Sequence, residues 1–122
     1  MASYSWYAQH AVLASENRGR KPGSGTPLRF PPNFAFLYNA LTLPEHRGRA
    51  LMANIHDFAA RRFAEEGVTH FLTTTDWTNT PALRAMQGGG FRSIGIMWRF
   101  GFGSSVACVY PRAARRLGVV IG

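Results

Sequence analysis

The sequence predicts a mixed α/β domain, and three observations lead to this fold class. The apolar segment from Phe34 to Leu43 has the pattern of a strand buried on both faces, and Pro44 ends it. Residues 50–66 place apolar side chains at three- and four-residue steps, which predicts a helix. The β-branched segment from Val68 to Thr75 predicts a second strand, so the three elements form a strand–helix–strand crossover with parallel strands.

Further elements are predicted on either side of this crossover. Aromatic and apolar side chains predict a strand over Ser3–Leu13, and several glycines and prolines predict a surface loop over residues 16–33. After the crossover, Pro81 in a first turn predicts a short helix over Thr80–Gln87. The last expected elements are a strand over Phe91–Phe102, a strand over Ser105–Tyr110 that forms a hairpin with it, and a short basic helix over Pro111–Leu117.

Length and composition limit the class of protein. The chain has 122 residues, so we expect residues 1–122 to form a single domain. A hydrophobic fraction of 46% argues against disorder, and no apolar run approaches the ~20 residues of a membrane-spanning helix. The single cysteine, Cys108, excludes a disulfide framework within the chain, and the four histidines form no metal-ligand pattern. With no secretory signal pattern at the N-terminus, we expect a cytoplasmic protein without a metal site or a membrane partner.

The charge favours an anionic partner. The formal net charge is +8, and Lys21 is the only lysine among the 14 basic residues. A basic domain of this kind suits nucleic acid, an acidic surface or a phosphorylated cofactor. Composition alone does not choose among the three.

The junction from Leu41 to Met52 combines the end of the buried strand, a basic turn and the start of the helix. The unpaired N–H groups of a first helical turn bind anions. Gly48 allows a close approach of the backbone to a ligand, and Arg47 and Arg49 add charged donors that suit phosphate. The junction therefore predicts a binding site for a diphosphate.

This junction and a later segment together resemble the GNAT family of N-acetyltransferases. The family carries R/Q-x-x-G-x-G/A at the start of a helix, followed by N-x-x-A and a helix that ends in G-F. Here Arg47 matches the first position of the loop, Asn79 and Ala82 match N-x-x-A, and Gly90–Phe91 match G-F. The resemblance covers residues 34–102. It implies the acyl-CoA N-acyltransferase fold, in which a mixed, mostly antiparallel central sheet contains a βαβ core that binds coenzyme A.

The resemblance also implies an activity and a set of site residues. In the family the loop holds the coenzyme A diphosphate, and the pantetheine lies where a bulged strand separates from its parallel neighbour. The expected reaction moves an acetyl group from acetyl-coenzyme A to a small-molecule or peptide amine, with the backbone N–H of Leu43 as oxyanion donor. Asp76 follows the second crossover strand and is either a general base that acts through water or a turn cap. The implied cofactor-binding residues are Leu41, Thr42, Leu43, Arg47, Gly48, Arg49, Ala50, Leu51, Met52 and Asn79.

The chain departs from the family pattern at three points. Ala50 and Met52 occupy the two small positions of the loop. Met86, which cannot donate a proton, stands where the family often has a tyrosine that protonates the leaving thiolate. In the family a strand and two helices normally precede the segment that Ser3–Leu13 resembles, so we expect a fragment, a compact variant, or a chain whose second copy supplies the missing layer. Because an uncovered sheet edge and face invite association, we expect a homodimer.

Three functions from different classes follow. The first is an N-acetyltransferase. The second is a catalytically impaired or truncated GNAT-like module that binds coenzyme A or a protein partner, and Met86 together with the missing layer motivates it. The third, a basic nucleic-acid-binding domain, rests on charge alone and is the least supported of the three.

Overall fold

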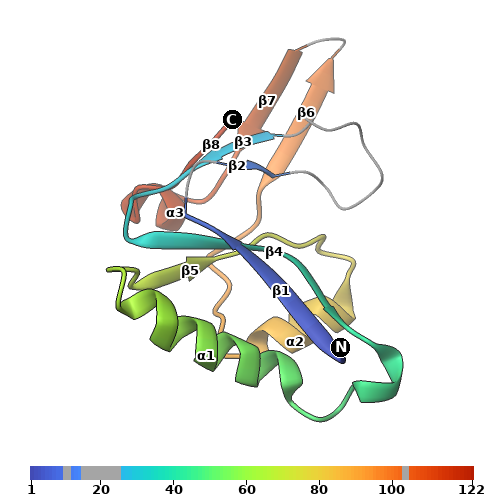
Figure 1. Ribbon diagram of the computed structural model, residues 1–122. Helices are drawn as coiled ribbons and strands as arrows, with labels where there is room; N and C mark the ends of the chain where they lie inside the picture. The colour runs from blue at the N-terminus through green and yellow to red at the C-terminus, as the bar shows by residue number, and fades with distance from the viewer. Residues whose placement is uncertain (10–11, 15–25, 103–104) are drawn as a thin grey trace. The chain divides into compact units, whose positions relative to one another are not determined.

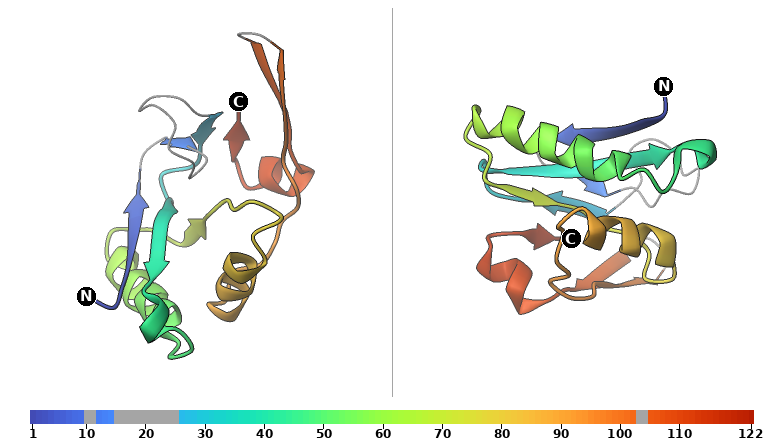
Figure 2. Two further views of the ribbon diagram at one scale, coloured as in Figure 1. Left: turned by 90° about the vertical axis from the view of Figure 1, so that its right-hand side faces the viewer. Right: turned by 90° about the horizontal axis from the view of Figure 1, so that it is seen from below.

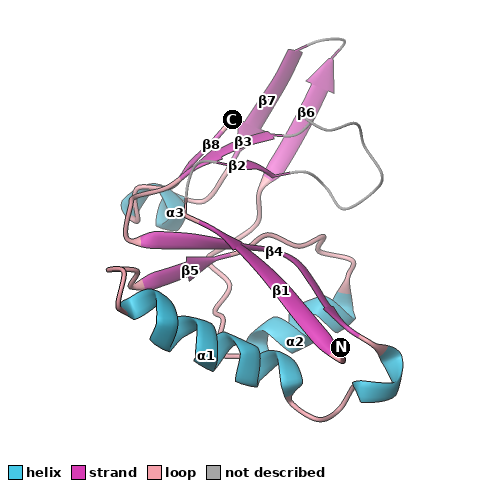
Figure 3. Ribbon diagram, in the orientation of Figure 1, coloured by secondary structure: helices cyan, strands magenta, loops and turns pink. Residues whose placement is uncertain are grey.

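The computed structural model describes residues 1–9, 12–14, 26–102 and 105–122, which belong to two compact units (Figure 1). The first unit comprises Met1–Gln9 and Pro32–Arg92, and the second comprises His10–Pro31 and Ser93–Gly122. A single domain over residues 1–122 stays a prediction. The elements, in chain order and as drawn in Figure 3, are β1 (Ser3–Ala8), β2 (Val12–Ala14), β3 (Thr26–Arg29), β4 (Phe34–Thr42), the 3-10 helix η1 (Pro44–His46), α1 (Leu51–Ala64), β5 (His70–Leu72), α2 (Thr80–Gly88), β6 (Trp98–Phe102), β7 (Ser105–Val109), α3 (Arg112–Arg116) and β8 (Val120–Ile121).

The first unit is built on a three-stranded sheet in the order β1, β4, β5. The central strand β4 is antiparallel to β1 and parallel to β5. Helix α1 connects β4 to β5 and lies along one face of the sheet (Figures 1 and 2). The predicted strand–helix–strand crossover is therefore present, and with it a mixed α/β fold that agrees with an acyl-CoA N-acyltransferase fold.

Aromatic side chains hold α1 against this sheet. Tyr7 of β1, Phe71 of β5 and Phe63 of α1 meet with ring centroids 5.2 to 5.9 Å apart. Each such pair adds about 0.5–1.5 kcal/mol beyond the area that it buries. The first half of β4 completes the core, because Phe34–Leu37 are all buried.

His56 of α1 lies in the same core, only 4% exposed. Its Nδ1 atom is 2.8 Å from the Tyr7 hydroxyl, which also receives a hydrogen bond from Ser5. Nε2 is buried and has no hydrogen-bond partner among the described residues. Burial lowers the pKa of His56, an effect that the carboxylate of Asp57 partly offsets. His56 is therefore a core histidine that is stable in its neutral form.

The end of α2 packs against this histidine. Phe91 follows the helix and meets the His56 ring edge-on, with centroids 5.1 Å apart. A Cβ atom at Gly89 would lie 2.9 Å from Cδ2 of His56, so a side chain there would displace the imidazole. Gly89 thus allows α2 and α1 to lie side by side (Figure 2).

The second unit contains a sheet in the order β2, β3, β8 and a separate ribbon of β6 and β7. Both are antiparallel. Its buried apolar side chains include Leu28, Ala114 and Val119. The predicted hairpin of the last two long strands and the short basic helix α3 are both present.

The structure differs from the sequence predictions in the N-terminal third of the chain. The strand expected over Ser3–Leu13 is divided into β1 and β2, with residues 10–11 outside the described part. The loop expected over residues 16–33 contains β3, while its residues 16–25 also lie outside the described part. A strand forms there despite Pro27, because the proline carbonyl still accepts a hydrogen bond of 2.8 Å from the Gly122 N–H.

Three further expectations concern strand length. The strand expected over Val68–Thr75 is reduced to β5, because its ladder with β4 covers only three residues. The strand expected from Phe91 begins only at Trp98, since Gly95 turns the chain at a φ of 130°, where its backbone packs on the Pro111 ring. In β4, burial on both faces stops at Leu37.

We expect the stability of the protein to depend on pH through His56. Because burial holds the folded-state pKa below its ordinary value of 6.5, the unfolded chain binds the proton more readily. The free energy of unfolding should be highest above pH 6.5. Below pH 6.5 it should fall by at most about 1.4 kcal/mol per pH unit. Urea unfolding between pH 5 and pH 8 measures this dependence.

The control is a pair of asparagine variants. His56→Asn keeps a hydrogen-bonding group near Tyr7 and removes the titration, so it should flatten the pH profile. His70→Asn, at an exposed histidine of β5, is the comparison variant. An unchanged slope in His56→Asn would show that another group carries the pH dependence.

Candidate functional site

The central feature of the site is an opening between the two parallel strands. The ladder pairs Phe34–Phe36 only with His70–Leu72. One more link follows, because the Thr73 hydroxyl donates to the Leu37 carbonyl over 3.1 Å. Within the described residues, β4 continues to Thr42 without a β5 partner on that edge. Backbone groups at the carboxyl end of β4 are thereby left available to a ligand.

A bulge in β4 accompanies this opening. Tyr38 pairs with Trp6 and Leu41 pairs with Tyr4, so Ser5 alone stands opposite residues 39 and 40. The extra residue on β4 bends the strand and changes which way its later groups point. The bulge and the separation from β5 are both features that the family resemblance implied for this strand.

Hydrogen bonds fix the direction of the amides at the strand end. The N–H of Leu43 donates to the carbonyl of Ala2 over 2.9 Å and therefore points toward β1. Since successive amides of an extended strand alternate in direction, the N–H of Thr42 points the other way, to the open edge. The expectation that Leu43 supplies an oxyanion donor does not fit this geometry, because its N–H already has a partner.

Arg47 lies over the same edge. The N–H and the carbonyl of one residue in an extended strand point to the same side, so the Thr42 carbonyl also faces the open edge. The Arg47 Nε donates to this carbonyl over 3.2 Å. Between the two residues the chain forms η1, with the His46 N–H on the Leu43 carbonyl. The sequence predicts a basic turn here but not its 3-10 form, and this form folds the exposed guanidinium back toward the end of β4.

The turn into α1 adopts a left-handed backbone at two positions. Gly48 has a φ of 77°, and Ala50 has a φ of 52° and a ψ of 24°. Ala50 is the only non-glycine residue with positive φ in the described chain, and it occupies the position where the family loop has glycine. A left-handed conformation costs an L-residue roughly 1–2 kcal/mol.

Helix α1 begins without a side-chain cap. The first hydrogen bond of the helix runs from the Asn54 N–H to the Ala50 carbonyl. The amides of Leu51, Met52 and Ala53 therefore have no intrahelical acceptor. With Arg47 and Arg49 exposed beside them, these amides fit a phosphate group in both charge and hydrogen bonding. Apart from Asn79, the structure brings the predicted cofactor-binding residues together at this one end of β4 and α1.

Asn79 and Asp76 both have local structural roles. The Asn79 side chain accepts a hydrogen bond of 3.2 Å from the Ala82 N–H and so caps α2. Asp76 accepts from the N–H and the hydroxyl of Thr78, at 3.0 and 2.8 Å, in the turn that leads to this cap. For Asp76 the structure thus contains the turn cap that was one of the two sequence interpretations.

The sheet face opposite α1 carries an exposed aromatic pair. Because Tyr7 packs on Phe63 of α1, its neighbour Trp6 points to the other face of the sheet. There Trp6 and its cross-strand partner Tyr38 meet edge-on, with centroids 6.1 Å apart, and they are 56% and 37% exposed. Leu41, 40% exposed, follows on the same strand. Tyr38 lies in the segment that the sequence predicts to be buried on both faces, and only the burial pattern of the folded strand shows its exposure.

The described residues contain neither a metal cluster nor a membrane-spanning helix. Among them, no group of three or more His, Cys, Asp or Glu side chains could hold a metal ion. No helix in that part of the chain has both the length and the apolar character needed to cross a membrane.

Comparisons with known proteins give one match. The model of the acetyltransferase (GNAT) family matches residues 6–91, which is more than half of the chain. Searches of curated proteins and of solved structures found no match. The matched range contains β4 with its bulge, the turn between β4 and α1, α1 itself, the opening between β4 and β5, and α2.

We expect Ala50→Gly to stabilise the protein. Glycine adopts the left-handed conformation without the Cβ penalty, so the free energy of unfolding should rise by about 1 kcal/mol. As a control, Ala60→Gly at an exposed interior position of α1 should lower it by about 1 kcal/mol. Urea denaturation of both variants measures the two shifts, and a destabilised Ala50→Gly would contradict a strained conformation at residue 50.

Proposed function

The chain belongs to the acetyltransferase (GNAT) family, and from this premise we propose that it transfers an acetyl group from acetyl-coenzyme A to a primary amine. The observation that supports the proposal is the opening between β4 and β5, with an outward amide and a basic helix start at its end. The chemistry that acetyl-coenzyme A supplies when bound is an activated thioester carbonyl. All remaining tasks fall to the protein: binding, orientation and proton removal.

Binding is assigned to the turn between β4 and α1. The unpaired amides of Leu51 and Met52, together with Arg47 and Arg49, would hold the diphosphate. Gly48 and Ala50 keep this turn tight enough for the backbone to contribute. Leu41 and Thr42 would line the opening, and Asn79 would contact the coenzyme from the start of α2.

Orientation of the thioester carbonyl is assigned to the backbone N–H of Thr42, in place of the backbone N–H of Leu43. The Thr42 N–H faces the open edge, whereas the Leu43 N–H is bonded to Ala2. A preorganised donor of this kind stabilises negative charge as it develops on the carbonyl oxygen. Proton removal from the incoming ammonium is assigned to Asp76 through water, since it follows β5 at the same end of the sheet.

Binding of the acceptor amine is assigned to the exposed aromatic pair. Trp6 and Tyr38 lie beside the bulge on the exposed face of the sheet, and ring faces attract an ammonium group. Apolar or aromatic amines would also gain from stacking on these rings.

A second function is favoured by one observation, the presence of Met86 in α2. A thioether has no proton to give to a departing thiolate. In this alternative the chain binds coenzyme A or a protein partner without turnover. Amine-dependent release of free thiol from acetyl-coenzyme A, measured over a panel of amines, separates the two functions. Saturable binding without thiol release would favour the non-catalytic module.

We expect Arg47→Ala to weaken acetyl-coenzyme A binding. Loss of a charge-assisted contact to phosphate costs about 1.5–3 kcal/mol, which corresponds to roughly tenfold to hundredfold in Kd. Titration calorimetry measures the change. The matched control is Arg61→Ala, which removes the same charge from an exposed position late in α1 and should change Kd less than twofold. Absence of binding by the unaltered protein at millimolar coenzyme would defeat the proposal.

We expect Trp6→Ala to raise KM for the amine while leaving KM for acetyl-coenzyme A nearly unchanged. Loss of one cation–π and stacking contact should raise the amine KM about fivefold or more. The control is Trp77→Ala, which removes another exposed tryptophan from the loop before α2. Equal effects of the two variants on the amine KM would count against an acceptor subsite at Trp6.

A further inference from the structure

The positive charge of the protein is concentrated in the second unit. Residues 10–31 and 93–122 contain eight of the 14 basic residues and one of the six acidic residues, a net charge of +7. The first unit has six basic and five acidic residues, a net charge of +1. The proposed coenzyme site lies in the first unit, so it accounts for little of this charge asymmetry.

The described part of the second unit contains no acidic side chain at all. Its basic residues are Arg29, Arg99, Arg112, Arg115 and Arg116. In α3 the last three are exposed and share one face at three- and four-residue spacing, while Ala114 is buried. The guanidinium of Arg115 lies 4.8 Å from the ring centroid of Tyr110, which holds it close to the end of β7.

Next to this helix, the β6–β7 ribbon carries exposed apolar and aromatic side chains. Trp98 is paired directly with Val109, and Phe100 with Ala107, so these four residues share one face of the ribbon. Trp98, Phe100 and Val109 are about half exposed, at 56%, 48% and 57%. Cys108, on the other face, lies next to Gly122. The Trp98 face is therefore the outer one.

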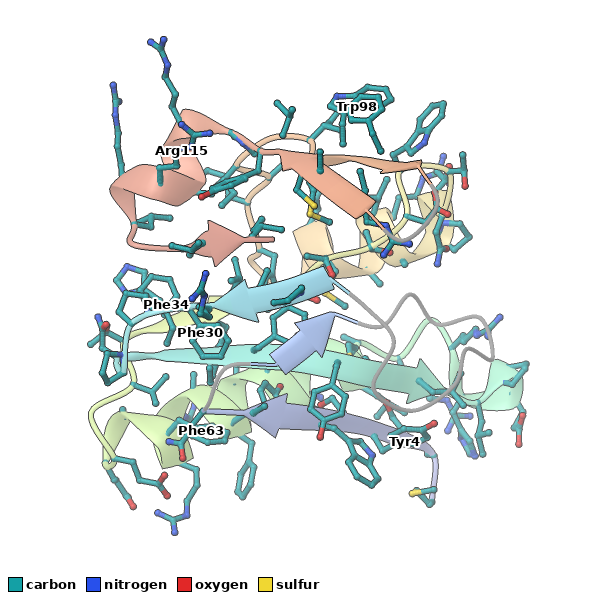
Figure 4. The ribbon with its side chains drawn as sticks, turned by 90° about the horizontal axis from the view of Figure 1, so that it is seen from above. Tyr4, Phe30, Phe34, Phe63, Trp98 and Arg115 are labelled. Atoms are coloured by element: carbon teal, nitrogen blue, oxygen red, sulfur yellow. The ribbon has the colours of Figure 1, made fainter. Side chains whose placement is uncertain are left out.

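Trp98 on β6 and Arg115 on α3 project toward the same side of the second unit in Figure 4. The chain passes from β7 to α3 through Tyr110 and Pro111 alone, so the arginines follow the ribbon directly. Together the Trp98 and Phe100 rings and the exposed arginines of α3 form a surface that we call the ribbon–α3 surface (β6, β7 and α3).

We propose that the ribbon–α3 surface binds single-stranded nucleic acid. Surfaces of this class combine aromatic platforms on which bases stack with positive charge that follows the phosphates. Duplexes are a poorer match, because bases that are stacked in a helix cannot reach the faces of Trp98 and Phe100. Membrane binding would need an amphipathic helix with a broad apolar face, and α3 has only five residues. In the sequence, nucleic-acid binding rests on charge alone. The exposed aromatic face of the ribbon adds the platform on which bases stack.

The test uses the full chain and a fluorescein-labelled oligo(dT) strand of about sixteen nucleotides, the upper end of the usual site size. Fluorescence anisotropy should show saturable binding, and log K should fall linearly with log salt, by about 0.7 for each phosphate that is neutralised. Trp98→Ala should weaken binding about fivefold or more, because one stacked base contributes ~1–3 kcal/mol. Trp98→Phe should keep most of the affinity.

Matched variants identify the surface. Trp6→Ala removes a tryptophan of equal exposure from the first unit and should leave binding unchanged. The double variant Arg115→Ala and Arg116→Ala should reduce the salt slope by about 1.4, whereas Arg61→Ala with Arg84→Ala should not.

Three outcomes would overturn the proposal. One is the absence of oligonucleotide binding at low salt. Another is equal loss of binding in Trp98→Ala and Trp6→Ala, because binding would then depend on general charge. The third is tighter binding to dextran sulfate or to anionic vesicles than to oligo(dT), which would assign the surface to another kind of partner. None of these readouts depends on acetyl transfer, so the proposed enzymatic function can fail or succeed separately.

Discussion

The departure of β5 from β4 after Leu37 is the constraint on which the rest of the first unit depends. A central strand normally exchanges backbone hydrogen bonds on both edges, and unpaired buried groups cost free energy. Here the chain supplies substitutes one at a time: the Thr73 hydroxyl for the Leu37 carbonyl, and the Arg47 guanidinium for the Thr42 carbonyl. The Thr42 amide remains directed to the open edge. A site of this kind consists of backbone groups that have no hydrogen-bonding partner in the neighbouring strand.

The start of α1 shows a second compromise between stability and binding. Two left-handed residues within three positions turn the chain sharply, so that the helix begins directly at the end of β4. Ala50 adopts this conformation with a Cβ atom in place, and no side chain caps the helix. Both features cost the folded protein stability, and the missing cap leaves the first amides of the helix unpaired. The preference of anions for such amides gives the arrangement a chemical use.

Much of this fold follows from local patterns in the sequence. The helical periodicity around Phe63, the cap residue Asn79 and the apolar segment at Phe34–Leu37 correctly indicate α1, α2 and the buried half of β4, because each depends on short-range spacing. The strand β3 was missed because its proline has no N–H, although the proline carbonyl bonds to Gly122 far along the chain. The amide of Thr42 could not be distinguished from that of Leu43, since the direction depends on a bulge that no residue type signals. His56, a buried histidine between two helices, likewise depends on a distant glycine at residue 89.

The bulge has a further consequence for how this strand can change. Because it adds one residue between Tyr38 and Leu41, it reverses the direction of every group that follows. Without it, Ser3 would pair with Leu41, and the amide of Thr42 would turn toward β1. The loss or gain of a single residue there would therefore reverse the whole end of the strand. The length of β4, more than the identity of any one side chain in it, therefore decides which backbone amide faces the open edge.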